Sequence, residues 1–234
     1  MNILHTNGFR GLVLGLSLAT FIGCTSSLWT PWHRGPHVTD PLGTLRTSDL
    51  PNERSQAIEL LGDAKDSIKN EEAAVAALVN SLEKETNVFL RAKTYRTLAK
   101  FRTKEAAQAI DRGLEDAAAE VRLACVDGVA IRGTETAGRQ LCTLLGSDTD
   151  LDVRIAASNH LAQYQGEHVR QALFAALDDR NPAVQRSVMQ SLGQITGETY
   201  GNDVAAWRAF AENRKPEARS ENVAQRVRGW FYSF

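Results

Sequence analysis

The stretch VRLACVDGVA (residues 121–130) decides the fold, because its pattern returns at a nearly fixed interval along the chain. Gap-free copies begin at Leu90, Val153 and Val184, so successive copies start 31, 32 and 31 residues apart. A weaker copy occupies residues 53–62. The four strong copies carry apolar or small residues at offsets 0, 4 and 8, which is the spacing of one helix face. Each copy is therefore predicted to be a helix.

A second helical pattern precedes each copy, for example Val169, Leu173 and Leu177. Turn residues separate the two patterns, as at Asn181-Pro182, where proline suits the first position of a helix. Each unit is thus predicted to be a helix, a short turn and a second helix. Such a hairpin cannot bury its apolar stripe alone, so neighbouring units must stack. This predicts an all-α fold.

An acid stands six residues before an arginine in three of the units. In this respect the chain resembles HEAT repeats of the short bacterial type, also described as phycobilisome-lyase-like, over about residues 53–197. The resemblance implies a right-handed α-solenoid of about five helical hairpins at residues 51–198. It also implies a structural ladder in which each arginine bridges its own turn and a neighbouring one. The predicted ladder consists of Glu85, Arg91, Asp116, Arg122, Asp148, Arg154 and Asp179, and the fourth unit has Gln185 in place of arginine.

The first 23 residues have the features of an export signal. Arg10 precedes an uncharged, mainly apolar run at residues 11–23, which is too short to span a bilayer as a helix. The run ends in Phe21-Ile22-Gly23-Cys24, which resembles the bacterial lipobox, although that motif usually has leucine where Phe21 stands. We predict a lipoprotein signal peptide at residues 1–23 and lipidation of Cys24. The alternative is an ordinary signal peptide with an incidental cysteine.

Residues 24–50 are predicted to be a flexible tether, because Gly, Pro, Ser and Thr make up half of residues 25–50. The predicted location is exported and lipid-anchored, on the periplasmic side of a bacterial membrane. Thr25 rather than aspartate follows the lipidation site, which slightly favours the outer membrane.

Residues 199–234 are predicted to form a C-terminal capping helix and an aromatic-basic tail. Residues 202–213 are amphipathic, with Asn202 or Asp203 as the N-cap and Trp207 and Phe210 on the buried side. The tail either folds over the last hairpin, lies on a membrane surface or docks a partner. Its apolar stripe consists of Val223, Val227, Trp230, Phe231 and Phe234, beside Arg226 and Arg228.

Charge and motifs give no support for nucleic-acid binding or catalysis. With 27 Lys and Arg against 28 Asp and Glu, the formal charge is −1, unlike the basic, aromatic groove of HEAT-like DNA glycosylases. HEAT-repeat enzymes that hydroxylate a lysine derivative hold iron with His-Glu pairs, and this sequence contains no His-Glu dipeptide. His33 and His37 are separated by Gly35-Pro36, which disfavours a helical metal site. We predict no enzyme activity, no cofactor and no metal.

Two cysteines follow Cys24. Cys125 occupies the same core offset as Ala157 and Val188, so it is predicted to be a small buried hydrophobe. A disulfide with Cys142 is the alternative, since an exported protein folds in an oxidising compartment. No histidine or other base has a sequence-level claim to neighbour either thiol, so neither is predicted to be a nucleophile.

The second helices of a HEAT stack line its concave face, where offsets 6 and 10 are expected to be exposed. Amide and guanidinium groups at these positions suit peptide backbone or carboxylates. We predict a partner-binding face, the alternative being a merely solvated surface. It consists of Lys93, Arg96, Lys100, Asp127, Asn159, His160, Gln163, Gln190 and Gln194.

The predicted function is that of a membrane-tethered scaffold or adaptor in the bacterial cell envelope. It would bind an unidentified protein partner on the concave face and touch the membrane through Cys24. Two alternatives remain open: a lyase-like or cofactor-attachment accessory subunit, and a self-associating structural envelope protein.

Overall fold

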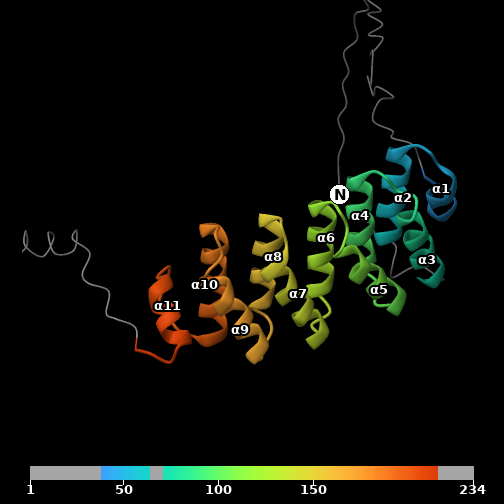
Figure 1. Ribbon diagram of the computed structural model, residues 1–234. Helices are drawn as coiled ribbons and strands as arrows, with labels where there is room; N and C mark the ends of the chain where they lie inside the picture. Colours follow the sequence, from blue (N-terminus) through green and yellow to red (C-terminus); the bar gives the residue numbers. More distant parts are fainter. Residues whose placement is uncertain (1–37, 64–70, 216–234) are drawn as a thin grey trace, which may run out of the picture. The chain divides into compact units, whose positions relative to one another are not determined.

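The computed structural model describes residues 38–63 and 71–215, and every regular element in these ranges is a helix. The chain order of the elements is shown in Figure 1. The helices are α1 (Pro41–Thr47), α2 (Pro51–Asp63), α3 (Glu71–Leu82), α4 (Val88–Leu98), α5 (Lys104–Gly113), α6 (Ala119–Ala130), α7 (Glu135–Ser147), α8 (Leu151–Leu161), α9 (Glu167–Ala176), α10 (Pro182–Thr196) and α11 (Val204–Ala211).

Successive helices pair as hairpins, and the hairpins stack. The pairs are α1–α2, α3–α4, α5–α6, α7–α8 and α9–α10, followed by α11. The second helices contact one another in turn, from α2 through α4, α6 and α8 to α10. Figure 1 shows α4, α6, α8 and α10 side by side in that order. The prediction of an all-α solenoid of about five hairpins is confirmed.

Side chains in the turns fix where the helices begin. Asn87, for example, accepts hydrogen bonds from the backbone N–H groups of Phe89 and Leu90, which have no partner inside α4. Proline occupies the first turn of α10, where a missing N–H costs nothing. The other side-chain N-caps are Asp40, Thr103, Thr134, Asp150, Asn181 and Asp203.

The repeat pattern forms the core. All twelve residues at offsets 0, 4 and 8 of the four strong copies are buried, so the predicted helix face is the packed face. Thr94, the polar member, donates its hydroxyl to the carbonyl of Leu90, which satisfies it without water. Small residues allow close packing: a Cβ on Gly113 would lie 2.4 Å from the Cys125 sulfur and 2.7 Å from the Tyr95 ring.

The prediction of a tether as far as residue 50 is wrong from Pro41 onward. Residues 41–47 form α1, with Asp40 as N-cap and proline in the first turn. Leu45 is buried in the core and Leu42 packs against it, because α1 packs against α2 and α3. The Gly, Pro, Ser and Thr content that suggested a tether includes the residues that start this helix. The solenoid therefore begins before residue 51.

Each ladder arginine joins two successive turns. The Nε and Nη2 groups of Arg122 donate to the carboxylate of Asp148 in the next turn, at 2.8 and 2.7 Å. Its Nη1 group donates to the backbone carbonyls of Asp116 and Ala117 in its own turn, at 3.0 and 3.2 Å. Both carboxylate bonds are charge-assisted and bidentate, which makes them strong and directional. The same carboxylate pairing joins Arg54 to Glu85, Arg91 to Asp116, and Arg154 to Asp179.

The ladder acid has a second role in its own turn. Asp148 accepts the N–H of Asp150 at 2.8 Å, and Asp116 accepts the N–H of Ala118 at 2.9 Å. Each acid therefore holds the turn that precedes the next helix while it receives the previous arginine. The predicted bridge between a unit's own turn and its neighbour is present, with a fixed direction: the arginine reaches the carboxylate that follows it in sequence.

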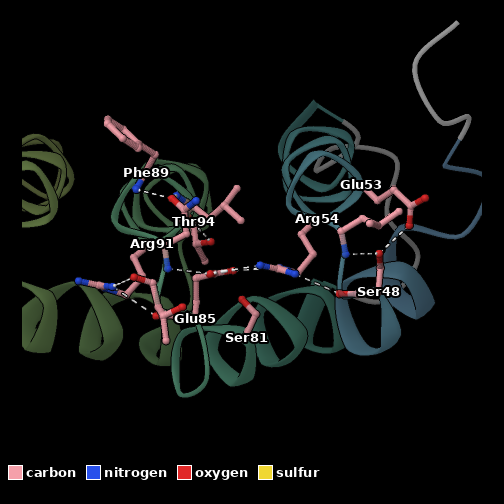
Figure 2. A network of polar contacts seen from close by, with 12 residues as sticks. Ser48, Glu53, Arg54, Ser81, Glu85, Phe89, Arg91 and Thr94 are labelled. Atoms are coloured by element: carbon pink, nitrogen blue, oxygen red, sulfur yellow. Dashed lines mark hydrogen bonds and ion pairs between the residues drawn. The ribbon is translucent and has the colours of Figure 1, made fainter.

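The first position of the ladder has no carboxylate and the last has no arginine. Ser48 stands six residues before Arg54 and accepts its Nη1 group through the backbone carbonyl at 3.2 Å. Its hydroxyl accepts the N–H of Leu50, just as each ladder acid accepts the backbone N–H two residues after it. The hydroxyl is uncharged, however, so it cannot form an ion pair with a preceding arginine. At the other end, Gln185 donates to the carbonyl of Asp179 at 2.9 Å and so keeps only the bond within its own turn. Figure 2 shows Arg54 between Ser48 and Glu85.

We expect the ladder to make stability fall at acid pH. Burial opposes ionisation of Asp116 and Asp148, but hydrogen bonds from an arginine and a backbone N–H, together with the nearby arginine charges, outweigh it and lower the pKa of both carboxyls. A lowered pKa stabilises the folded state fully above the unfolded value of about 3.9 and is lost as pH falls through the folded pKa. The urea midpoint should thus be nearly constant from about pH 7 to 5 and fall below about pH 4. An Arg122→Ala/Asp148→Asn chain should lose less over the same interval, and an equal loss would contradict the assignment.

Helix α11 closes the C-terminal end of the described fold. Asp203 is its N-cap, and Trp207 is buried against Tyr200, whose ring centroid lies 5.0 Å away. The Trp207 indole N–H donates to the carbonyl of Gly201 at 3.0 Å. The predicted helix is present but shorter, over residues 204–211 rather than 202–213, and its tryptophan is buried, with Phe210 half-buried. The aromatic-basic tail from residue 216 lies outside the described residues, as do residues 1–37.

Candidate binding face and basic hollow

The helical register places the predicted binding residues on one side of α4, α6, α8 and α10, which we call the even-helix face. Because these four helices repeat every 31 or 32 residues, equal offsets occupy equivalent positions. Lys93 and His160 are half-buried and the other predicted residues are exposed. Ile131, which caps the end of α6 at offset 10 of its repeat copy, is 64% exposed. The face consists of Lys93, Arg96, Lys100, Asp127, Ile131, Asn159, His160, Gln163, Gln190 and Gln194.

Several of these side chains bind the neighbouring helix. Lys93 reaches back to α2, where its Nζ lies 2.8 Å from Glu59 and 2.9 Å from the Ser55 hydroxyl. His160 Nε2 lies 2.9 Å from Asp127 Oδ1, which joins α8 to α6. Further links join Lys100 to Asp63 and Ser187 to Asn159. The partners on α2 were not predicted, because the weaker copy of the repeat was left out of the predicted face. Ser187 was missed because offset 3 is not one of the two offsets, 6 and 10, on which the prediction was based.

Other members of the even-helix face are free to bind a partner. The side chains of Arg96, Gln163, Gln190 and Gln194 make no hydrogen bond or ion pair with any residue that the structure describes. Each is exposed and carries donors, and the glutamines also carry acceptors. The predicted residues thus fall into two groups. Some link neighbouring helices, and the others remain available to bind a partner.

A hollow of about 500 Å³ lies where α4 and α6 end. Its floor is mainly apolar, and Arg96, Lys100, Arg102 and Arg132 contribute its charged groups. Of these, Arg102 and Arg132 were missed by the sequence analysis, because they occupy offsets 12 and 11 of their copies rather than offset 6 or 10. The lining consists of Arg96, Ala99, Lys100, Phe101, Arg102, Thr103, Ala107, Ile110, Gly128, Ile131, Arg132 and Thr134.

Arg132 is held in a polar cluster that joins three helices. Its Nη2 group lies 2.5 Å from Asp111 of α5 and 3.3 Å from the side-chain oxygen of Gln140 of α7. Gln140 in turn donates to Asp111 at 3.0 Å. Burial opposes ionisation of Asp111, but these hydrogen bonds outweigh it and lower the pKa of the carboxyl. The Nε–H group of Arg132 is buried and has no acceptor among the described residues.

The thiols are placed differently. Cys125 is buried in the core, as predicted, and burial raises the pKa of its thiol. Cys142 is half-buried, and the two cysteines are free, so the structure shows no disulfide between them. A buried thiol with a raised pKa forms little of the reactive thiolate.

Within residues 38–63 and 71–215, no group of three His, Cys, Asp or Glu side chains is placed to hold a metal. Cys24, His33 and His37 lie outside these ranges.

The stacked hairpins resemble those of known proteins. A search of solved structures finds human deoxyhypusine hydroxylase in complex with glycerol, at 20% identity and a TM-score of 0.46. The match covers 68% of this chain and 73% of that one. A search of curated proteins finds no match. The family model for HEAT repeats matches residues 39–130, 75–162 and 138–221, which together span most of the chain. The chain therefore belongs to the HEAT-repeat family.

Proposed function

We propose that this HEAT-repeat scaffold works in the bacterial cell envelope, tethered to a membrane, and binds a protein partner on the even-helix face. The observation that carries the proposal is the division of this face. Its half-buried members link neighbouring helices, while Arg96, Gln163, Gln190 and Gln194 are exposed without a partner in the described part of the chain. HEAT-repeat stacks typically serve as protein-binding surfaces.

The tether rests on the sequence. The lipobox-like Phe21-Ile22-Gly23-Cys24 follows a short apolar run, and a lipidated Cys24 would hold the solenoid at the membrane. None of the helices in the described ranges is long and apolar enough to cross a bilayer. Thr25 after the cysteine supports the outer membrane, on its periplasmic side.

A binding role is favoured over catalysis by the chemistry of the described groups. The thiol that aligns with the repeat, Cys125, is buried and its pKa is raised, which is the opposite of nucleophile activation. The exposed groups of the even-helix face are chiefly amides, joined by the cations of Arg96 and Lys100, and such groups suit recognition rather than proton transfer at neutral pH.

Photo-crosslinking tests the proposal in cells. A photoreactive phenylalanine analogue would replace Gln163 or Gln190 on the even-helix face. Matched positions on the other row of helices are Thr143 of α7 and Gln171 of α9, which are also exposed. We expect one protein to crosslink from Gln163 and Gln190 and not from Thr143 or Gln171. Crosslinking only from the latter pair, or from none of the four, would refute the proposed face.

The same experiment separates the alternatives. A crosslinked product with twice the mass of the chain would instead indicate self-association. A Cys24→Ser chain should lose incorporated radiolabelled fatty acid and leave the membrane fraction, and it should lose the crosslink if the partner is itself membrane-bound. Retention of the fatty acid by this variant would refute the assigned anchor.

A further inference from the structure

The basic hollow at the ends of α4 and α6 differs in character from the rest of the even-helix face. Toward α8 and α10 the exposed members of the face are uncharged amides, such as Gln163 and Gln190. Around the hollow they are cationic, and no acidic residue is among the described residues that line it. This end of the face therefore presents a localised positive potential in a protein whose formal charge is −1.

The cations of the hollow differ in whether they already form an ion pair with an acidic residue. Arg96 and Arg102 are exposed and form no ion pair with a described residue. Lys100 pairs with Asp63 at 3.2 Å, but both side chains are largely solvated, so the pair is weak. Arg132 is fixed by Asp111, yet its buried Nε–H lacks an acceptor in the described structure. The hollow thus has unused donors for an anionic group.

The floor of the hollow is aliphatic. Ile131 is 64% exposed, and it lies beside Ile110 and Ala99 in the lining. Gly128 lets the elements that form the floor pack closely, since a Cβ there would approach Ala99 to 3.2 Å and Ile110 to 3.3 Å. An exposed isoleucine surrounded by cations gains most from an occupant that brings both an apolar side chain and carboxylates.

We propose that this hollow receives an acidic segment of the protein partner, with an aliphatic side chain against Ile131 and flanking carboxylates on Arg96 and Arg102. This inference rests on the proposed function and specifies the chemistry of the partner. The volume of about 500 Å³ suits one or two side chains rather than a folded domain. A single-stranded nucleic acid is disfavoured because its bases need exposed aromatic rings, and Phe101, the aromatic residue in the lining, is buried.

Selection from a random peptide library tests the chemistry directly. The full chain would be immobilised in detergent and used to enrich displayed peptides. We expect an enriched family with Asp or Glu within two residues of Leu, Ile or Val. The highest-affinity synthetic peptide would then be titrated by fluorescence anisotropy. Arg96→Ser/Arg102→Ser and Ile131→Ser should each weaken its binding by about tenfold or more.

Matched variants keep the test specific. Arg139→Ser/Arg170→Ser removes the same charge from exposed positions on α7 and α9 and should leave the affinity unchanged. Replacing the acids of the peptide by amides should weaken binding as much as the Arg96→Ser/Arg102→Ser change does. Thermal unfolding of each variant should match that of the parent chain, because the substituted side chains are exposed.

Three outcomes would overturn the inference: no enriched family, an enriched family without acids, or equal affinity for the parent chain and the Arg96→Ser/Arg102→Ser chain. A single-stranded oligonucleotide that displaces the peptide at lower concentration than the peptide itself would also overturn it. Crosslinking from Gln163 and Gln190 would still support the proposed function in any of these cases, so the two failures can be told apart.

Discussion

Replacing Arg122 by alanine is expected to lower the free energy of unfolding by about 3–5 kcal/mol, because it removes one partner of a buried ion pair. The side chain of Asp148 is 3% exposed, and that of Arg122 is 13% exposed. Without the guanidinium group, the carboxylate stays in a desolvated turn with only a backbone N–H as donor. The carbonyls of Asp116 and Ala117 lose a donor as well. Urea denaturation monitored by circular dichroism measures the loss.

Two variants show whether the loss arises from a stranded charge. Arg139→Ala removes an arginine that is 63% exposed and pairs with Glu135 on the same helix, so it should cost less than about 1 kcal/mol. Arg122→Ala/Asp148→Asn removes the stranded charge and should be more stable than Arg122→Ala alone. If the double variant is instead less stable than Arg122→Ala, the uncompensated carboxylate is not the cause.

Replacing Trp207 by alanine is expected to cost about 3–5 kcal/mol at the C-terminal end of the solenoid. The indole is 1% exposed, contacts Tyr200 and Phe210 edge-on, and donates to the carbonyl of Gly201. Because each unit of a solenoid contacts only its neighbours, the damage should be local. Hydrogen exchange should accelerate in α9, α10 and α11 and stay unchanged in α4.

A surface aromatic provides the control for Trp207. Phe89 is 76% exposed, so Phe89→Ala should change stability by no more than about 0.5 kcal/mol. Trp207→Phe keeps an aromatic ring in the site and should lose less than Trp207→Ala. Equal acceleration of exchange in α4 and α10 would show that the described helices unfold as a single unit, contrary to the local effect expected for a terminal cap.

The sequence predicted the packed faces of α4, α6, α8 and α10 and the members of the ladder. It did not predict which acid pairs with which arginine. A spacing of six residues identifies Asp116 and Arg122 as belonging to one unit. In the structure the carboxylate of Asp116 binds the arginine of the unit before, and its carbonyl binds Arg122. The same six-residue spacing is compatible with either pairing, because it does not state which atoms meet. Arg54, in the weakest copy of the repeat, was not predicted as a rung, because Ser48 rather than an acid stands six residues before it.

The errors lie where local composition and tertiary contacts disagree. Asp40 and Pro41 occur in a stretch rich in turn-forming residues, and the same residues start α1 once Leu45 has a core to enter. The basic hollow was not predicted, although Arg96 and Lys100, two of its cations, were predicted to bind a partner. Arg102 and Arg132 follow different helices, and their common position depends on how α4 packs beside α6. Helical periodicity relates positions along one helix and does not show which residues of two neighbouring helices meet.

The directional pairing of the ladder also bears on how such a protein changes length during evolution. Every internal unit offers a carboxylate to its predecessor and a guanidinium group to its successor, so a duplicated internal unit would fit between two others without altering a single pair. A unit added before Ser48 would meet a hydroxyl, and one added after Gln185 would meet an amide. Duplication of an internal unit therefore keeps every ion pair of the ladder, whereas a unit added at either end needs a compensating substitution to form a new pair. Ser48 and Gln185 thus mark the two places where the series of carboxylate–arginine pairs ends.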